Sequence, residues 1–165
     1  MSNLELVLPE IFLSLSIMFL LILGVFKKDS SKLVQNTALV ILLITAVITF
    51  NETLGIKQTF LFNDSVIIDY LSSFMKIVTL LAAFLVLAIS SNYLKTFKIF
   101  KIEYPILILS AVLGMMVMIS SNDLIVFYMG LELQSLALYV LATFNRDQLK
   151  SSEAGLKYFV LSALS

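Results

Sequence analysis

The stretch LIVFYMGLELQSLALYVLATF, residues 124–144, decides the fold class of this chain. It is long enough to cross a bilayer as a helix, since about 20 mostly apolar residues span the hydrocarbon core. Its one charged residue, Glu132, lies eight residues after Leu124, about 12 Å of helical rise into the run. A charge is costly at that depth and rarely persists there without a function. We therefore expect proton or ion handling inside a membrane.

The next stretch, SSEAGLKYFVLSALS at residues 151–165, places a lysine just inside a further apolar run. Ser152 is expected to cap this helix, with Glu153 adding negative charge at its positive end. Lys157 then lies four residues after Glu153, about 6 Å of rise. At that depth it can act in a relay, or it can snorkel to the interface.

Composition places the surface of this chain against lipid or other subunits. Hydrophobic residues make up 60% of the chain, charged residues only 13%, and the mean hydropathy is +1.03. The net charge of zero gives no sign of a nucleic-acid partner. The chain has no His or Cys, which argues against haem, iron–sulfur and Cys/His zinc sites. Its five glycines form no dinucleotide or phosphate motif, so we expect no cofactor and no metal here.

The apolar runs predict an all-α, polytopic transmembrane bundle of five full helices plus the start of a sixth. We expect no strands, because the runs lack the alternation of membrane barrels, and we read residues 51–69 as an ordinary external loop. The last run is too short to span a bilayer, so the sequence looks like the front of a longer one. The expected helices cover about 11–26, 33–50, 70–92, 104–121, 124–144 and, truncated, 153–165.

The charges of the connections predict an orientation. Connections 27–32, 93–103 and 145–152 hold eight Lys or Arg, whereas those on the other side hold only Lys57. This bias places the N-terminus on the non-cytoplasmic side of an integral, multi-pass protein. The flank before the first run is acidic, with Glu5 and Glu10, which is unlike a secretory signal.

A second lysine, Lys76, lies six residues inside the third run, about 9 Å of rise from Tyr70. A functional role is one reading. The reading we favour is a side chain whose stem snorkels to the external interface.

Two readings of Glu132 remain open on the residues alone. Desolvation and a nearby cation act oppositely on a carboxyl group, which suits a proton carrier. A permanently protonated, structural glutamate bonded to another helix is the other reading. In a straight hairpin, Glu132 and Lys157 differ in depth by about 12 Å, which limits their coupling to roughly 1.4 kcal/mol. We therefore expect the two to sense one another without touching.

The segments GLELQSLALYVLATFNRD (130–147) and SSEAGLKYFVLSALS (151–165) resemble a known family. They are similar to subunit N of the bacterial proton-pumping NADH–quinone oxidoreductase, which corresponds to subunit 2 of mitochondrial complex I. The likeness is strong over roughly residues 104–165. It implies an N-terminal fragment, with residues 1–165 forming the first part of an antiporter-like membrane domain of about fourteen helices.

The resemblance also implies a function and a site. Glu132 and Lys157 match residues of the family's proton relay, whose further lysines lie on later helices. NADH, FMN, iron–sulfur clusters and quinone would bind other subunits. The partners would be other membrane-arm subunits of complex I, the lipid bilayer and protons, in a bacterial inner membrane rather than a mitochondrial one.

We therefore expect a membrane-arm subunit that couples electron transfer from NADH to quinone to proton translocation. One alternative is a subunit of a cation/proton antiporter of the related family. Another is a structural membrane piece in which neither charge titrates.

Overall fold

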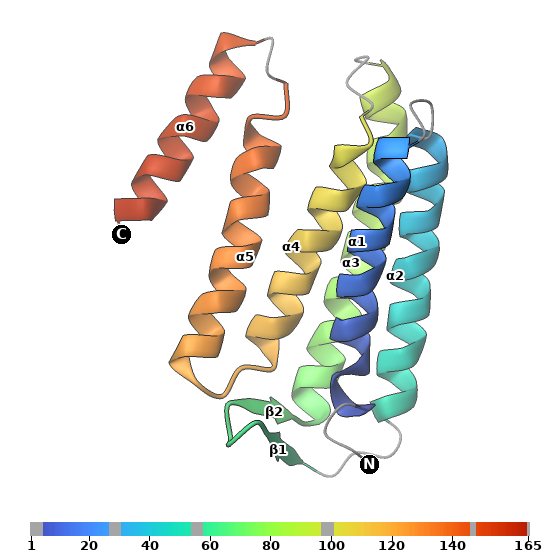
Figure 1. The fold of residues 1–165 in the computed structure, drawn as a ribbon, viewed down its shortest axis with the longest axis vertical. Coiled ribbons are helices and arrows are strands. Elements are labelled where there is room, and N and C mark those ends of the chain that lie inside the picture. Colours follow the sequence, from blue (N-terminus) through green and yellow to red (C-terminus); the bar gives the residue numbers. More distant parts are fainter. Residues whose placement is uncertain (1–4, 27–30, 54–57, 97–100, 146–147, 165) are drawn as a thin grey trace.

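The chain folds as a bundle of helices with one short hairpin at one end (Figure 1). The computed structural model describes residues 5–26, 31–53, 58–96, 101–145 and 148–164. The elements are a 3-10 turn η1 (Glu5–Val7), helices α1 (Leu8–Phe26), α2 (Ser31–Thr53), α3 (Tyr70–Thr96), α4 (Glu103–Ile119), α5 (Leu124–Ala142) and α6 (Leu149–Leu164), and strands β1 (Thr59–Leu61) and β2 (Val66–Ile68).

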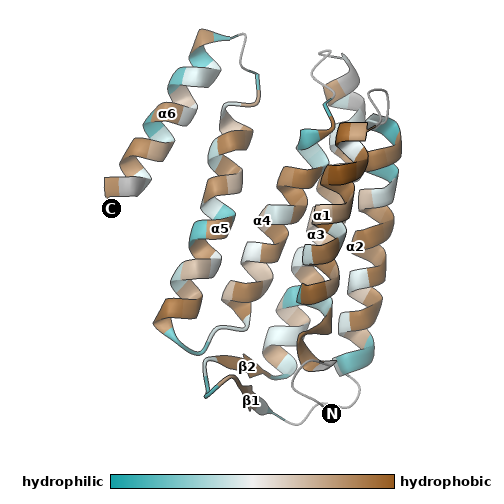
Figure 2. Cartoon of the chain, viewed as in Figure 1, coloured by the Kyte–Doolittle hydropathy of each residue, from teal (hydrophilic) through white to brown (hydrophobic). Residues whose placement is uncertain are grey.

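The expected all-helical membrane bundle is confirmed in outline. Among the described residues, four helical segments are long and apolar enough to cross a membrane: α1, α2, Tyr70–Ser91 of α3, and α5. Helix α4 is apolar but has only 17 residues. Figure 2 shows hydrophobic residues along most of these helices, with hydrophilic ones concentrated near their ends and at a few places between.

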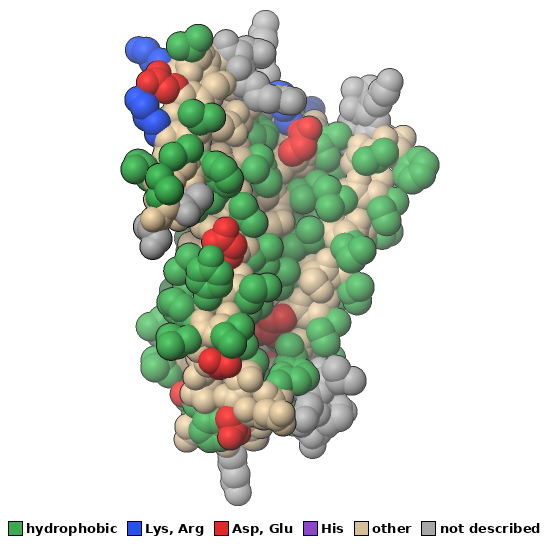
Figure 3. Space-filling view, turned by 60° about the vertical axis from the view of Figure 1, so that its left-hand side comes forward, with side chains coloured by type: hydrophobic (Ala, Val, Ile, Leu, Met, Phe, Trp, Pro, Cys, Tyr) green, Lys and Arg blue, Asp and Glu red, His purple; other side chains and the backbone are tan. Residues whose placement is uncertain are grey.

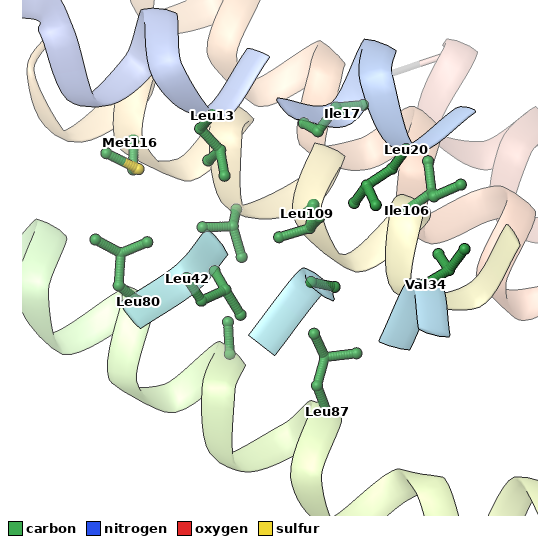
Figure 4. Close-up of a cluster of buried hydrophobic side chains, with 13 residues drawn as sticks. Leu13, Ile17, Leu20, Val34, Leu42, Leu80, Leu87, Ile106, Leu109 and Met116 are labelled. Atoms are coloured by element: carbon green, nitrogen blue, oxygen red, sulfur yellow. The ribbon is translucent and has the colours of Figure 1, made fainter. Parts of the chain in front are cut away.

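Helices α1 to α4 share one apolar core. Apolar residues recur every three or four positions on each helix, which puts them on one face. Leu13 of α1, Leu42 of α2, Leu87 of α3 and Leu109 of α4 are essentially inaccessible to solvent. Figure 4 shows these side chains converging from the four helices. The core is completed by Ile17, Leu20, Val34, Ala38, Leu80, Ala83, Ile106, Val112 and Met116.

Helices α5 and α6 extend the bundle to one side (Figure 1). Helix α5 packs against α4, and α6 packs against α5. Only 17% of the apolar span of α5 is buried, against 28–33% for the other three spans. The helix that carries Glu132 therefore keeps most of its surface uncovered by the described chain.

Several helix ends differ from the sequence prediction. Helix α1 begins at Leu8, three residues early, which draws Glu10 into its first turn. Helix α6 begins at Leu149, so the expected cap by Ser152 is wrong and this residue lies inside the helix. The apolar run marks where a helix must be buried in lipid. The backbone remains helical beyond that run because polar residues also adopt helix at the interface.

The prediction of no strands was wrong for residues 51–69. Strands β1 and β2 form an antiparallel pair, with Phe60 opposite Ile67. Three residues in the turn, Phe62, Asn63 and Asp64, have positive φ angles. Three-residue strands are too short to show alternation. Contacts from distant residues stabilise the pair: Leu61 and Ile68 are buried together with Leu6, and Ile67 N donates to Ser120 O at 2.8 Å.

The basic connections can be followed only in part. Lys27, Lys28, Lys57, Lys98 and Arg146, on which the predicted orientation partly depends, lie outside the described residues. Figure 3 shows lysine side chains gathered at one end of its face, whereas single acidic side chains are scattered among hydrophobic ones. The hairpin lies at the opposite end of the bundle from the α5–α6 connection (Figure 1).

Candidate proton-transfer site

The start of α5 is fixed by a local cap. Asp123 has an extended backbone, and its side chain accepts a hydrogen bond from Ile125 N at 3.3 Å. Aspartate is favoured at this position because its carboxylate satisfies an amide that has no partner within the helix. The cap sets the depth of the helix, since Glu132 follows the first residue by about 12 Å of rise.

A close contact between two glycines sets the rotation of α5. A Cβ atom added at Gly114 of α4 would lie 2.6 Å from Gln134 N and 2.8 Å from Gly130 O. A Cβ added at Gly130 would lie 2.8 Å from Met118 N. The two backbones approach closely because neither residue has a side chain. The face of α4 that carries Gly114 is therefore a packing surface.

This contact turns Glu132 away from α4. Glu132 follows Gly130 by two residues, which is a rotation of about 200° around the helix. Its side chain is half-buried. In the described part of the chain, its carboxylate takes part in no hydrogen bond or ion pair, and Ser135 Oγ donates to its backbone oxygen at 3.0 Å. The carboxylate is therefore available to other segments or to water.

The face of α5 that carries Glu132 is open over two turns and then covered by α6. Tyr128 and Leu136, one turn to either side of Glu132, are 61% and 45% exposed. Tyr139, two turns after Glu132, is buried. Its hydroxyl donates to Ser162 Oγ, and its ring makes edge contacts with Tyr158 and Phe159.

Lys157 forms an ion pair within its own helix. Its Nζ lies 2.6 Å from Glu153 Oε1, one turn earlier, and both side chains are more than half exposed. The expected absence of a direct Glu132–Lys157 contact is confirmed among the described residues.

The register of α5 against α6 explains why these two charges do not meet. A Cβ added at Gly155 would meet the side chain of Thr143, and Phe159 contacts Tyr139. Four residues forward on α6 therefore correspond to four residues back on α5. Lys157 then lies level with Leu141, nine residues from Glu132, which is about 13 Å of rise.

The structure corrects the favoured reading of Lys76. Its side chain is 3% exposed, and its Nζ lies 2.5 Å from Oε1 of Glu10 on α1. It does not snorkel, because Glu10 in the first turn of α1 provides a counter-charge within the bundle. The sequence does contain a signal for this pair: an acidic residue, Glu10, near the start of the first apolar run and a basic residue, Lys76, near the start of the third.

The acidic side chains of the described residues form no candidate metal centre. Within the described ranges, no group of three or more His, Cys, Asp or Glu residues could hold a metal ion.

Comparison with known proteins finds a family match over the segment that carries Glu132 and Lys157. The family described as "NADH:quinone oxidoreductase/Mrp antiporter, TM" matches residues 121–165, which include both Glu132 and Lys157. The protein named NADH-quinone oxidoreductase subunit N of Pelagibacter ubique is 70% identical over all 165 residues. Over its whole length the chain is therefore similar to proteins named subunit N.

Other relatives with that name show the same similarity. Those of Paramagnetospirillum magneticum and Maricaulis maris are each 50% identical, over 96% and 99% of this chain. The chain covers 35%, 32% and 34% of the three relatives. It thus spans about a third of the length of the curated relatives it matches. The match to the Pelagibacter ubique protein also covers residues 1–103, outside the segment of strong likeness.

Proposed function

We propose that this chain acts in the membrane arm of an NADH–quinone oxidoreductase, where it takes part in proton translocation. The observation that carries the proposal is Glu132: a half-buried carboxylate in the middle of an apolar helix, with no partner among the described residues. The 70% identity to a subunit N protein supports the same activity.

The mechanism we propose is electrostatic. Quinone reduction in another subunit would change the charge of a neighbouring group, and this change would alter the proton affinity of Glu132. At about 13 Å and an effective dielectric constant near 20, a charge on Lys157 changes the energy of Glu132 by roughly 1.3 kcal/mol. That is about one pKa unit, so water or other lysines would complete the path.

The open face of α5 has a role in this proposal. Tyr128 and Leu136 would be covered by further membrane helices or subunits, which would bring the partner groups of Glu132. NADH, FMN, iron–sulfur clusters and quinone would bind elsewhere in the complex. The bacterial relatives favour the inner membrane of a bacterium as the location.

A cation/proton antiporter is the second candidate, because the matching family description also names such antiporters. Inverted membrane vesicles containing the native complex distinguish the two. We expect NADH to drive acidification of the vesicle interior without a sodium or potassium gradient. Acidification driven by either cation and independent of NADH would instead support the antiporter.

The role of Glu132 is tested in the same vesicles. The Glu132→Ala variant should assemble but translocate fewer protons for each NADH oxidised. An assembled variant that pumps normally would remove Glu132 from the mechanism.

A further inference from the structure

A second group of charges lies among helices α1, α2 and α3, at the hairpin end of the bundle. We infer that Glu10, Glu52 and Lys76 form a proton-binding site in which two carboxylates and one ammonium hold one exchangeable proton. The site is distinct from Glu132, and it does not depend on the proposed function.

The ion pair between Glu10 and Lys76 is the buried half of the site. Glu10 is 8% exposed and Lys76 is 3% exposed. A charge removed from water in this way needs both a counter-charge and hydrogen bonds for its remaining polar atoms. Glu10 Oε1 has the counter-charge, 2.5 Å from Lys76 Nζ.

The second oxygen of Glu10 is left without a donor. Oε2 is buried, and no hydrogen-bond donor among the described residues reaches it. Two buried hydroxyls of α2 already donate within their own helix: Thr49 Oγ1 donates to Thr45 O at 2.9 Å, and Thr45 Oγ1 donates to Ile41 O at 2.7 Å. An acceptor in this state is a place where a proton can be added.

Glu52 brings a second carboxylate to the same place. The buried stripe of α2 runs through Thr45 and Thr49, and Glu52 follows Thr49 on the same face by three residues. Glu52 lies close enough to interact electrostatically with both Glu10 and Lys76. It is only half-buried, so it connects the buried pair with the outside.

The charge count of the three residues points to a proton. With both carboxylates ionised and Lys76 charged, the cluster has a net charge of −1 in a setting that penalises net charge. One added proton makes it neutral. The ammonium of Lys76 already occupies the position a metal cation would take.

Among the described residues, the other titratable groups at this end do not neutralise the cluster. Asp64, Tyr70 and Asp123 are exposed. Asp69 accepts a hydrogen bond from Ser72 N at 2.7 Å and so caps α3. Helix α4 contributes Ser120, whose hydroxyl donates to Met116 O, and the charged residue of α4, Glu103, lies at its opposite end. The side chain of Glu5, on η1, lies outside the described residues.

Infrared difference spectroscopy of the native complex in vesicles tests the site directly. The pH is stepped, and the C=O stretch of protonated carboxyl groups is compared between the parent and each variant. Glu52→Gln should remove one titrating carboxyl signal, because the Glu10–Lys76 pair that remains is neutral. Lys76→Met should have the opposite effect, adding one protonated carboxyl group and moving the titration to higher pH.

The matched control is Glu103→Gln, the same substitution at an exposed position of α4, which should leave the signal unchanged. A Glu52→Gln spectrum identical to the parent would overturn the proposal, as would loss of an equal signal in Glu103→Gln. Displacement of the proton by sodium at constant pH would overturn it in favour of a cation site. The signal should persist in Glu132→Gln, so its loss there would assign it to Glu132 instead.

Discussion

Gly114 on α4 and Gly130 on α5 hold two helix backbones together at the depth of the candidate site. A Cβ on Gly114 would lie only 2.8 Å from the carbonyl oxygen of Gly130. The atoms in the way are backbone atoms, which cannot rotate aside. Because Gly130 precedes Glu132 by two residues, the same contact that packs the helices also determines the direction in which the carboxylate points.

Replacing Gly130 by alanine should therefore separate the two helices. Forcing a methyl group into a packed contact typically lowers the free energy of unfolding by about 1–3 kcal/mol, and it should also reduce proton translocation by displacing Glu132. Thermal unfolding of the complex and vesicle acidification measure the two effects. Gly24→Ala is the control, because its Cβ would meet the side chain of Ile102 rather than backbone atoms. Equal effects of the two variants would contradict the role given to the glycine contact.

The Glu10–Lys76 pair predicts a stability effect that depends on both partners. Lys76→Met leaves a buried carboxylate without its counter-charge, and we expect a loss of about 3 kcal/mol in the free energy of unfolding. The double variant Glu10→Gln/Lys76→Met should recover much of that loss, because no unpaired charge remains.

The exposed pair on α6 provides the comparison for this cycle. Glu153 and Lys157 are also in contact, but they lie one turn apart on a single helix and both side chains are more than half exposed. Lys157→Met should change stability by less than about 1 kcal/mol. If the double variant on α1 and α3 is less stable than Lys76→Met alone, the ion pair is not the reason for the loss.

Docking of α6 depends on the hydroxyl of Tyr139. Tyr139→Phe keeps the ring contacts with Tyr158 and Phe159 but removes the hydrogen bond to Ser162, a loss of about 1 kcal/mol. Amide hydrogen exchange across α6 should speed up accordingly. Tyr128→Phe, at an exposed position of the same helix, should leave that exchange unchanged, and a similar acceleration in both would count against the contact.

The absence of cysteine makes the predicted orientation easy to measure. Asn63→Cys lies in the exposed hairpin turn and Gln148→Cys near the start of α6, at opposite ends of the bundle. A membrane-impermeant thiol reagent should label Asn63→Cys from the non-cytoplasmic side and Gln148→Cys only from the cytoplasmic side. The reverse pattern would invert the topology inferred from the basic connections.

The sequence predicted the helices well and their contacts poorly, for a physical reason. Burial in lipid requires long apolar runs, so the positions of the helices can be predicted from such runs, for example residues 124–144. The same uniformity hides which face of a helix meets protein, because lipid-facing and buried residues are equally apolar. This is why the short hairpin, which depends on contacts with Leu6 and Ser120, could not be predicted.

The charged residues show the same division. The central depth of Glu132 followed from counting residues along one helix. The partner of Lys76 could not be found this way, since Glu10 lies 66 positions away in the sequence and the two meet only in the folded bundle. The sequence places Lys157 by its distance from Glu153. In the structure its depth relative to α5 is determined by the contact between Thr143 and Gly155.

The most direct test of the account is proton translocation by Glu132→Gln in vesicles that contain the assembled complex. The substitution keeps the size and shape of the side chain but removes the group that binds a proton. We predict that fewer protons are translocated for each NADH oxidised than in the parent, whereas the exposed control Glu103→Gln translocates as many as the parent. Parental translocation by an assembled Glu132→Gln complex would contradict the account and leave Glu132 with a structural role alone.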